Sequence, residues 1–556
     1  MTAIGIDLGT TYSLVAAFRN NKAELIPNVH GDYLTPSVVS MDKEGRVLIG
    51  RPARERLISH PKETAHAFKR LIGSSKTWRL GKSKLRPEEL SALILKSLKR
   101  DAEKYLGEAV DDVVISVPAY FNDIQRRATQ SAAQLAGLNV IQLVNEPTAG
   151  AMVYGLNDTE DDRKYMILDL GGGTFDITLL EYFDGVFEVH ASAGDNFLGG
   201  EDFTHILAEW IGRETRNRFG TKLSAELTYQ LAEQSKKSLS ERGCLHIQVG
   251  DENSLELSDK LMEEICRPLL EKLRVPIVTS LQDADLHPDD LDDIVLVGGS
   301  TRMPVFREFV TRMFRRFPRQ SENPDHVVAK GAAIIAGLLE RDESLREVVM
   351  TDVMPYSMGI EIQNEAAPER GIFDPIIERN QTIPISRESR YYPATESQRS
   401  IELKIYQGES RYVENNLRLG TIKLKVPRKH DERFVDVRFT YDASGILEVI
   451  VASGSGIEKR LVIEQTPGEM SKKEIEAALK KLDSIKIHPR DMEKYKAILC
   501  RAERLYEQST GEDRQALGRF IQEYESLLQT QDLARIERKF PAFKQALDDY
   551  EHQEWF

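Results

Sequence analysis

One pattern occurs twice in this chain: an apolar run, an aspartate, a glycine turn with hydroxyl residues, and a second apolar run. The first copy is Ile4-Gly-Ile-Asp7-Leu-Gly-Thr-Thr11, and the second is Ile167-Leu-Asp169-Leu-Gly-Gly-Gly-Thr-Phe-Asp176. Each copy predicts a β-hairpin. One glycine turn of this kind is ordinary, but a repeated supersecondary unit indicates two similar subdomains.

The residue types in these turns suit a bound nucleotide. Glycine lets backbone N–H groups approach phosphate oxygens, and threonine hydroxyls add donors. An aspartate at the end of each first strand, Asp7 or Asp169, offers the hard oxygen that Mg²⁺ prefers. A third glycine turn, Gly298-Gly-Ser-Thr-Arg302, follows the apolar run Ile294–Val297. It is either a further contact to the nucleotide or a plain turn from strand to helix.

The chain has 556 residues, more than one hydrophobic core accommodates, so several domains are expected. Strand and helix patterns alternate up to about Glu340. From Thr351 to Ile463 the apolar residues recur at every second position, which predicts antiparallel β-structure. Helical periodicity follows a capping box of Ser471 and Glu474. The apolar run between Glu347 and Asp352 is either a strand edge or a linker that docks.

Composition excludes several function classes. There are 75 Lys and Arg against 89 Asp and Glu, a net charge of −14, which argues against a nucleic-acid partner. No apolar stretch is long enough to span a membrane, and the N-terminus lacks a signal-peptide pattern. The cysteines Cys244, Cys266 and Cys500 form no Cys-x-x-Cys pair. We therefore expect a cytoplasmic protein without nucleic-acid or membrane partners.

Several motifs closely resemble the DnaK family of 70-kDa heat-shock chaperones. They are Asp7–Thr11, Val117–Arg126, Asn145–Thr148, Asp169–Asp176, Leu198–Phe203 and Gly298–Arg302. The resemblance covers Ile4 to about Ile487. The segment Gly371–Asn380 and the short helical end are most similar to the HscC branch.

The resemblance implies a multidomain chain. It would consist of an α/β ATPase domain similar to actin and hexokinase at 1–347, with two similar lobes around a cleft, and a linker at 348–352. An antiparallel β-sandwich that binds peptides would follow at 353–468, and a truncated α-helical lid at 469–556. The implied function is an ATP-dependent chaperone that couples Mg-ATP hydrolysis to reversible binding of unfolded or extended polypeptide segments.

Carried over residue by residue, the resemblance gives roles to the site. Asp7, Glu146 and Asp169 would surround Mg²⁺, mostly through water, and Lys69 would act on the attacking water and γ-phosphate beside Thr174. From the sequence alone, a solvated helix lysine is the favoured interpretation of Lys69, and the resemblance reverses it. ATP or ADP, with K⁺ as a further ion, would be held by Gly9, Thr10, Thr11, Tyr12, Gly171, Gly172, Gly173, Asp176, Gly199, Gly200, Glu201, Glu233, Lys236, Lys237, Ser240, Gly298, Gly299, Ser300, Arg302 and Asp325.

The resemblance also implies a relay and a peptide site. Pro118, Arg126 and Asp352 would pass the nucleotide state between domains. The peptide would contact Ile360, Gln363, Tyr391, Ala394, Ile401 and Leu403. Gln363 stands where the family usually has methionine, which suggests a more polar client or a more open arch. Ile401 and Leu403 are equally well explained as core residues.

Three departures concern partners. Gln142 replaces an arginine that meets the J-domain protein in the family, so a dedicated J-domain co-chaperone is expected. The stretch from Glu241 to Ser258 is shortened, which suggests that no exchange factor is needed. The short tail after Ser471 suggests weaker retention of peptide.

Other functions on the same fold are a small-molecule kinase, an actin-like filament ATPase, or a relative that no longer hydrolyses ATP. A kinase would not need the β-structured and helical regions. The presence of Lys69, Glu146, Asp169 and Thr174 speaks against the loss of hydrolysis.

Overall fold

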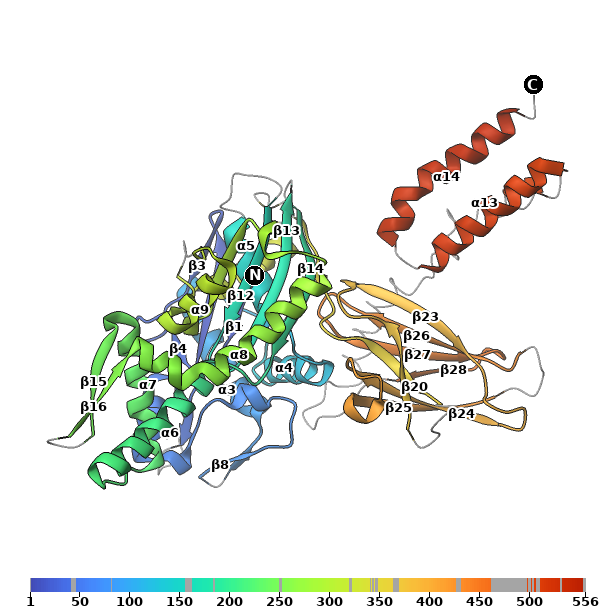
Figure 1. The fold of residues 1–556 in the computed structure, drawn as a ribbon. Helices are drawn as coiled ribbons and strands as arrows, with labels where there is room; N and C mark the ends of the chain where they lie inside the picture. Colours follow the sequence, from blue (N-terminus) through green and yellow to red (C-terminus); the bar gives the residue numbers. More distant parts are fainter. Residues whose placement is uncertain are drawn as a thin grey trace.

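The chain forms two α/β lobes, a β-sandwich and a helical end (Figure 1). The computed structural model describes residues 2–41, 47–81, 83–155, 163–183, 186–249, 253–319, 323–340, 342, 345, 349–363, 370–426, 432–461, 498, 502, 505–506, 511–530 and 533–553. This architecture agrees with the α/β, antiparallel β and helical regions predicted from the sequence. The capping box at Ser471 and Glu474 lies outside the described residues.

The first lobe is built on a sheet in the order β11-β10-β1-β2-β3, with β4 paired to β2. Its main elements are β1 (Ile4–Leu8), β2 (Tyr12–Arg19), β3 (Lys22–Leu25), β4 (Thr35–Pro36), β10 (Asp112–Val117), β11 (Asn139–Asn145), α3 (Pro87–Leu106) and α4 (Asp123–Leu135). A smaller layer adds β5 (Val39–Met41), β6 (Val47–Ile49), β7 (Thr64–Ala65), β8 (Trp78–Leu80), β9 (Ser83–Leu85), α1 (Arg51–Arg54) and α2 (Arg56–Ser59). Helix α4 begins where the sequence predicts, because Asn122 accepts the backbone N–H of Gln125 at 2.9 Å.

The second lobe repeats the plan with a sheet in the order β17-β12-β13-β14-β18. Its strands and helices are β12 (Arg163–Leu170), β13 (Phe175–Phe183), β14 (Val186–Asp195), β15 (Cys244–Gln248), β16 (Ser254–Ser258), β17 (Asp293–Val297), β18 (Val349–Met350), α6 (Gly200–Phe219), α7 (Ala225–Arg242), α8 (Asp259–Asp283) and α9 (Pro304–Phe314). Strands β1 and β2 form one antiparallel hairpin, and β12 and β13 form the other. The predicted pair of hairpins is therefore confirmed.

Two helices, α5 (Glu146–Gly155) and α10 (Val327–Leu339), pack together at very close range. A Cβ atom at Gly331 of α10 would lie 1.7 Å from the backbone oxygen of Ala149 on α5. A Cβ at Gly5 of β1 would likewise lie 2.1 Å from the backbone nitrogen of Ala333. Glycine is thus required where α10 meets both the first lobe's sheet and the helix that starts at Glu146.

The β-structured region consists of two four-stranded sheets that form a sandwich, β21-β20-β24-β25 and β23-β26-β27-β28, and of a separate two-stranded sheet, β19-β22. Its strands are β19 (Asp352–Val353), β20 (Met358–Ile362), β21 (Ile372–Ile377), β22 (Thr382–Ile383), β23 (Ile385–Tyr391), β24 (Ser400–Gln407), β25 (Leu417–Lys425), β26 (Val435–Tyr441), β27 (Leu447–Ser453) and β28 (Glu458–Leu461). The inward-facing residues of both sheets form one buried core. This is the period-two pattern expected from the sequence.

The segment that joins the second lobe to the sandwich is a strand edge. Val349 and Met350 pair in parallel with Val186 and Phe187 of β14, and the Thr351 N–H donates to the oxygen of Phe187 at 2.9 Å. This settles the alternative that the sequence left open. Val348 lies outside the described residues.

The chain ends in the helices α13 (Gly511–Gln529) and α14 (Leu533–Gln553), which pack through an apolar cluster of their own. The aromatic rings of Phe520, Tyr524 and Phe543 lie at its centre. Among the described helices, none is both long enough and apolar enough to cross a membrane.

We predict that Gly331→Ala destabilises the protein by about 1–3 kcal/mol, because the added methyl group meets a backbone atom that cannot move alone. Thermal and urea unfolding would measure the change. Gly212→Ala on α6 is the matched control, since its Cβ would lie 3.6 Å from Thr228, an ordinary contact. Equal stability of the two variants would contradict the close packing of α5 and α10.

Candidate functional site

A cavity of about 550 Å³ lies between the two lobes, and both glycine hairpins contribute to it. From the first lobe come Asp7, Gly9, Thr10, Thr11, Tyr12 and Lys69, and from α5 comes Glu146. From the second lobe come Asp169, Gly171, Gly172, Thr174, Gly200, Glu201, Glu233, Lys236, Lys237, Ser240, Gly298, Gly299, Ser300, Arg302 and Asp325. Residues predicted from both copies of the pattern thus line the same cavity.

The two hairpin turns touch each other. A Cβ atom at Gly172 in the second turn would lie 2.0 Å from the Thr11 hydroxyl oxygen of the first turn, and one at Gly9 would lie 2.0 Å from the oxygen of Tyr12. Side chains at these positions would fill the space between the turns. Glycine therefore leaves backbone groups of both lobes facing one small volume, the arrangement that phosphate binding requires.

Three acidic side chains meet at the bottom of this cavity. Lys69 donates to Glu146, with Nζ and Oε1 2.5 Å apart, and both side chains are almost fully buried. Ser116 donates to the Asp7 carboxylate at 3.3 Å. Burial and the neighbouring Glu146 raise the pKa of Asp7 to about 7, and the same two causes raise the pKa of Asp169 well above its usual value.

This acidic cluster fits a hydrated divalent cation. Raised carboxyl pKa values show that negative charge is under-compensated there, so a cation would be favoured. Among the described residues, no three acidic, histidine or cysteine side chains are placed to hold a metal ion directly. The carboxylates of Asp7, Glu146 and Asp169 line the cavity together, and Mg²⁺ is commonly bound by carboxylates while it keeps several of its waters.

One wall of the cavity is helix α7, which presents Glu233, Lys236, Lys237 and Ser240. Lys236 Nζ lies 2.7 Å from Glu233 Oε2 and also donates to the Thr204 hydroxyl at 2.6 Å. Burial alone would raise the pKa of Glu233, but Lys236 and Lys237 outweigh it and lower the pKa to about 2. The four α7 residues that the resemblance assigns to nucleotide binding thus form a polar wall of the cavity.

The third glycine turn, Gly298–Arg302, also contributes residues to the lining of the cavity. Ser300 donates to the oxygen of Gly171 at 2.8 Å, which joins this turn to the second hairpin. Arg302 pairs with Asp325 at 2.7 Å. Gly298 has a φ of 83°, a left-handed conformation that disfavours a side chain.

Three predicted nucleotide residues do not line the cavity. Gly173, Gly199 and Asp176 lie behind its surface. Asp176 is fully buried opposite Asp169 in the strand pairing and accepts the backbone N–H of Tyr120 at 3.0 Å. Burial and Glu146 raise its pKa to about 7. Asp176 thus connects the cavity floor to Tyr120.

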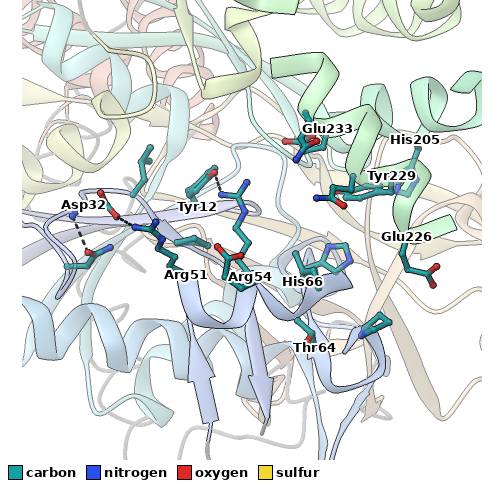
Figure 2. A pocket seen from close by; sticks show the side chains of 18 of the residues that line it. Tyr12, Asp32, Arg51, Arg54, Thr64, His66, His205, Glu226, Tyr229 and Glu233 are labelled. Atoms are coloured by element: carbon teal, nitrogen blue, oxygen red, sulfur yellow. Dashed lines mark hydrogen bonds and ion pairs between the residues drawn. The ribbon is translucent and has the colours of Figure 1, made fainter. Parts of the chain in front are cut away.

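A larger cavity of about 1070 Å³ opens onto this site, and the two cavities share Tyr12, Leu34 and Glu233. Figure 2 shows Arg54 directed at Tyr12, with Tyr229 and His205 adjacent on the facing side. The Tyr229 hydroxyl donates to Glu201 at 2.5 Å. The sequence analysis missed Arg54 and Tyr229, because neither lies in a motif that marks it.

A buried polar cluster joins the first lobe to the β-sandwich. Arg126 donates to Asn145 at 2.6 Å and to the oxygen of Ser444 in the sandwich at 3.4 Å. Burial raises the pKa of Asp352, whose carboxyl interacts with Asn145 and Arg126. Two of the three predicted relay residues therefore meet, next to Glu146. The third, Pro118, is buried at the end of β10 and its oxygen accepts the N–H of Phe121 at 3.1 Å.

The predicted peptide residues fall into two groups. Ile360, Ile401 and Leu403 belong to the buried core of the sandwich, and Tyr391 packs against that core. Gln363 and Ala394 are exposed, and the Ala394 N–H donates to Gln398 Oε1 at 2.9 Å. The described part of the sandwich therefore presents a closed core at these positions, not an open apolar pocket.

Two lobes with twin phosphate-type turns around an acidic, lysine-bearing cavity define a nucleotide-dependent ATPase that carries a β-sandwich. The chain matches the family described as Hsp70 protein over residues 3–80 and 75–555. It is 40% identical over 481 residues to the protein named Chaperone protein DnaK from Thermotoga neapolitana, which covers 83% of this chain and 80% of that protein. It is 38% identical over 486 residues to Chaperone protein DnaK from Thermosipho africanus, with 83% and 79% covered.

The chain belongs to the Hsp70 family. It is therefore an ATP-dependent chaperone that uses Mg²⁺ and hydrolyses ATP to ADP and phosphate to drive its cycle.

The raised carboxyl pKa values predict a specific pH dependence. Asp7 and Asp176 bind protons more strongly in the folded state than in the unfolded state, so without a cation their contribution to stability falls as pH rises from about 4 to about 7. Mg²⁺ binding needs the ionised form, so the stabilisation by Mg-ADP should grow over the upper part of this range. Melting temperatures at pH 5.5 to 8, with EDTA or Mg-ADP, test this.

Asp7→Asn is the control for this measurement. The variant should fold and should lose most of the pH-dependent gain from Mg-ADP. A gain that stays constant with pH in the unsubstituted protein would refute the interpretation of the acidic cluster.

Proposed function

We propose that this chaperone hydrolyses ATP with Lys69, Glu146, Asp169, Thr174 and Asp7 as its reacting side chains. Glu146 holds the Lys69 ammonium group deep in the cavity, within reach of a terminal phosphate lying between the two turns. A bound Mg²⁺ would neutralise phosphate charge. The residues of the chain position the nucleotide and the attacking water, which is most of what phosphoryl transfer to water requires.

The nucleotide would lie along the cavity from the turns to α7. Thr10, Thr11 and the backbone at Gly171 and Gly172 suit the phosphates, and the α7 wall with Arg302 suits the adenosine. The proposal gives Gly173, Gly199 and Asp176 supporting positions, since they lie behind the surface. We also propose that K⁺ binds beside Mg²⁺ in the nucleotide site.

Coupling to the β-sandwich would pass through two connected sets of residues. Glu146 directly follows Asn145, which holds Arg126, and Arg126 reaches Ser444. Thr174 and Tyr120 both contact Asp176, and the Tyr120 ring lies 4.3 Å from that of Tyr356. A change at the terminal phosphate would alter both sets, which is the differential contact that coupling requires.

The client would be an unfolded or extended polypeptide held by the sandwich at 353–468 and covered by the helices of 469–556. The closed core at Ile360, Ile401 and Leu403 supports a cycle in which the docked form holds no peptide and the separated form does. We further propose that the clients form a specialised set and that the chain belongs to the HscC branch of the family.

The partners are proposed from two departures. Gln142, half-exposed on β11, would favour a dedicated J-domain co-chaperone over a general one. Strands β15 and β16 form a short hairpin, which supports nucleotide exchange without a separate factor. A nucleotide off-rate that stays slow until an exchange factor is added would contradict the second point.

The observation that carries the proposal is the buried contact between Lys69 and Glu146 at a cavity lined by both hairpins. Steady-state ATP hydrolysis of the unsubstituted protein and of Lys69→Ala, each titrated with an unfolded peptide, tests it. We expect Lys69→Ala to hydrolyse ATP about 10²-fold more slowly and to keep binding nucleotide. An unsubstituted protein whose rate does not respond to peptide favours a kinase or a filament ATPase, which ATP-dependent light scattering separates.

We predict that Arg379→Gln weakens docking of the sandwich. Arg379 makes a bidentate contact with Asp283 at 2.6 and 2.9 Å and bridges to Glu409. Small-angle scattering with ATP should show a larger radius of gyration for the variant. Arg390→Gln is the control, because Arg390 pairs with Asp436 inside the sandwich. Equal radii for the two variants would exclude a docking role for Arg379.

A further inference from the structure

The two sheets of the sandwich meet at an open edge that carries an unusual side chain. Strand β21 is the edge of one sheet and β23 is the edge of the other. Asp374 on β21 lies directly opposite Ile360 on β20, and Ile360 lies opposite Ile405 on β24. Side chains at opposed positions share a face of the sheet. Asp374 is therefore the edge member of a row of side chains that face the core.

The Asp374 carboxylate has a neutral partner. The Tyr391 hydroxyl, at the end of β23, donates to Asp374 Oδ2 at 2.7 Å. Burial and this hydrogen bond raise the pKa of Tyr391, so its phenol stays protonated as a donor. In the part of the chain that the structure describes, no Lys, Arg or His forms an ion pair with Asp374, and the Tyr391 hydroxyl contacts Oδ2, not Oδ1.

The cations of the neighbouring strand are engaged elsewhere. Arg390 faces outward and pairs with Asp436 at 2.7 Å, while Arg387, four residues before Tyr391, donates to Gln381 at 3.3 Å. A partly buried carboxylate whose described partner is a neutral hydroxyl can form a charge-assisted hydrogen bond with a cation that a ligand delivers.

We propose that Asp374 is the specificity-determining residue of the peptide site and selects polypeptide segments that place a lysine or arginine inside it. In the separated form of the proposed cycle, the alkyl part of such a side chain would pack beside Ile360 and Ile362, and the cationic end would reach Asp374 Oδ1. This inference rests on the proposed peptide-binding function. It adds a client class: segments whose buried residue is basic, not purely apolar.

The geometry favours a cation over an apolar side chain for a definite reason. A norleucine side chain of the same reach as lysine would leave the carboxylate desolvated beside a methyl group, whereas an ammonium group satisfies it. Gln363 is exposed and has an amide where the family usually has methionine, so a lysine or arginine of the client is tolerated beside it. Tyr391 remains bonded to Oδ2, because a carboxylate accepts several hydrogen bonds.

The test compares two fluorescent heptapeptides that differ only at the centre, lysine or norleucine, between leucines. Their affinities are measured by anisotropy for the full-length protein with ADP. We expect the lysine peptide to bind about tenfold more tightly. Asp374→Asn should reduce this ratio to about one, and Tyr391→Phe should preserve it, because the carboxylate remains.

Two controls separate this effect from the net negative charge of the protein and from structural damage. Glu402→Gln removes one exposed charge from the outer face of the same sandwich and should leave the ratio unchanged. The ratio should also persist between about 0.1 and about 0.5 M potassium chloride, whereas a general surface attraction would be screened. Melting temperature and basal ATP hydrolysis show that each variant is folded.

The outcomes are distinct. Equal affinity of the lysine and norleucine peptides overturns the selectivity of Asp374 and leaves the chaperone function intact. Loss of selectivity in both Asp374→Asn and Tyr391→Phe overturns it too, because the pair would then act as a structural latch between the sheets. Absence of binding by every peptide overturns the proposed peptide site itself and this inference with it.

Discussion

The structure depends on the confinement of acidic side chains between two lobes that could otherwise separate. Asp7 and Asp169 repel each other and Glu146, and burial strengthens that repulsion because little water is present to screen it. Lys69 is the cation that reaches them. A cleft of this kind holds its lobes together best when a further positive charge and a bridging phosphate are present.

That confinement also places the bridge to the β-sandwich directly beside the cavity. The residues that bridge to the sandwich are immediate neighbours of the acidic cluster: Asn145 precedes Glu146, and Asp176 lies opposite Asp169. Asn145 and Asp176 are both buried among close-packed side chains, so a small shift of the lobes would displace the residues around them. The sandwich contributes Ser444 and Tyr356 to the same packed region.

Local patterns in the sequence predicted the parts of the fold that local chemistry determines. The hairpins of Asp7 and Asp169 and the start of α4 at Asn122 follow from turn and capping rules. The role of Lys69 came from a family resemblance, because a single lysine has no local signature. Asp374 was not recognised, since its inward direction depends on a register shift between Met358 and Gly359 and on a partner from another sheet. Arg126 was expected as a relay, but its contact with Ser444 joins residues 318 positions apart, which only the tertiary fold brings together.

The short strand β18 pairs with β14, which would otherwise be the edge strand of the second lobe's sheet. When the sandwich moves away and takes Val349 and Met350 with it, Val186 and Phe187 lose their neighbour and expose unpaired backbone groups. An unpaired edge strand of this kind can pair with a strand of another chain. A cycle that undocked the sandwich would therefore open the second lobe's sheet to pairing between chains, and the return of β18 would cover that edge again.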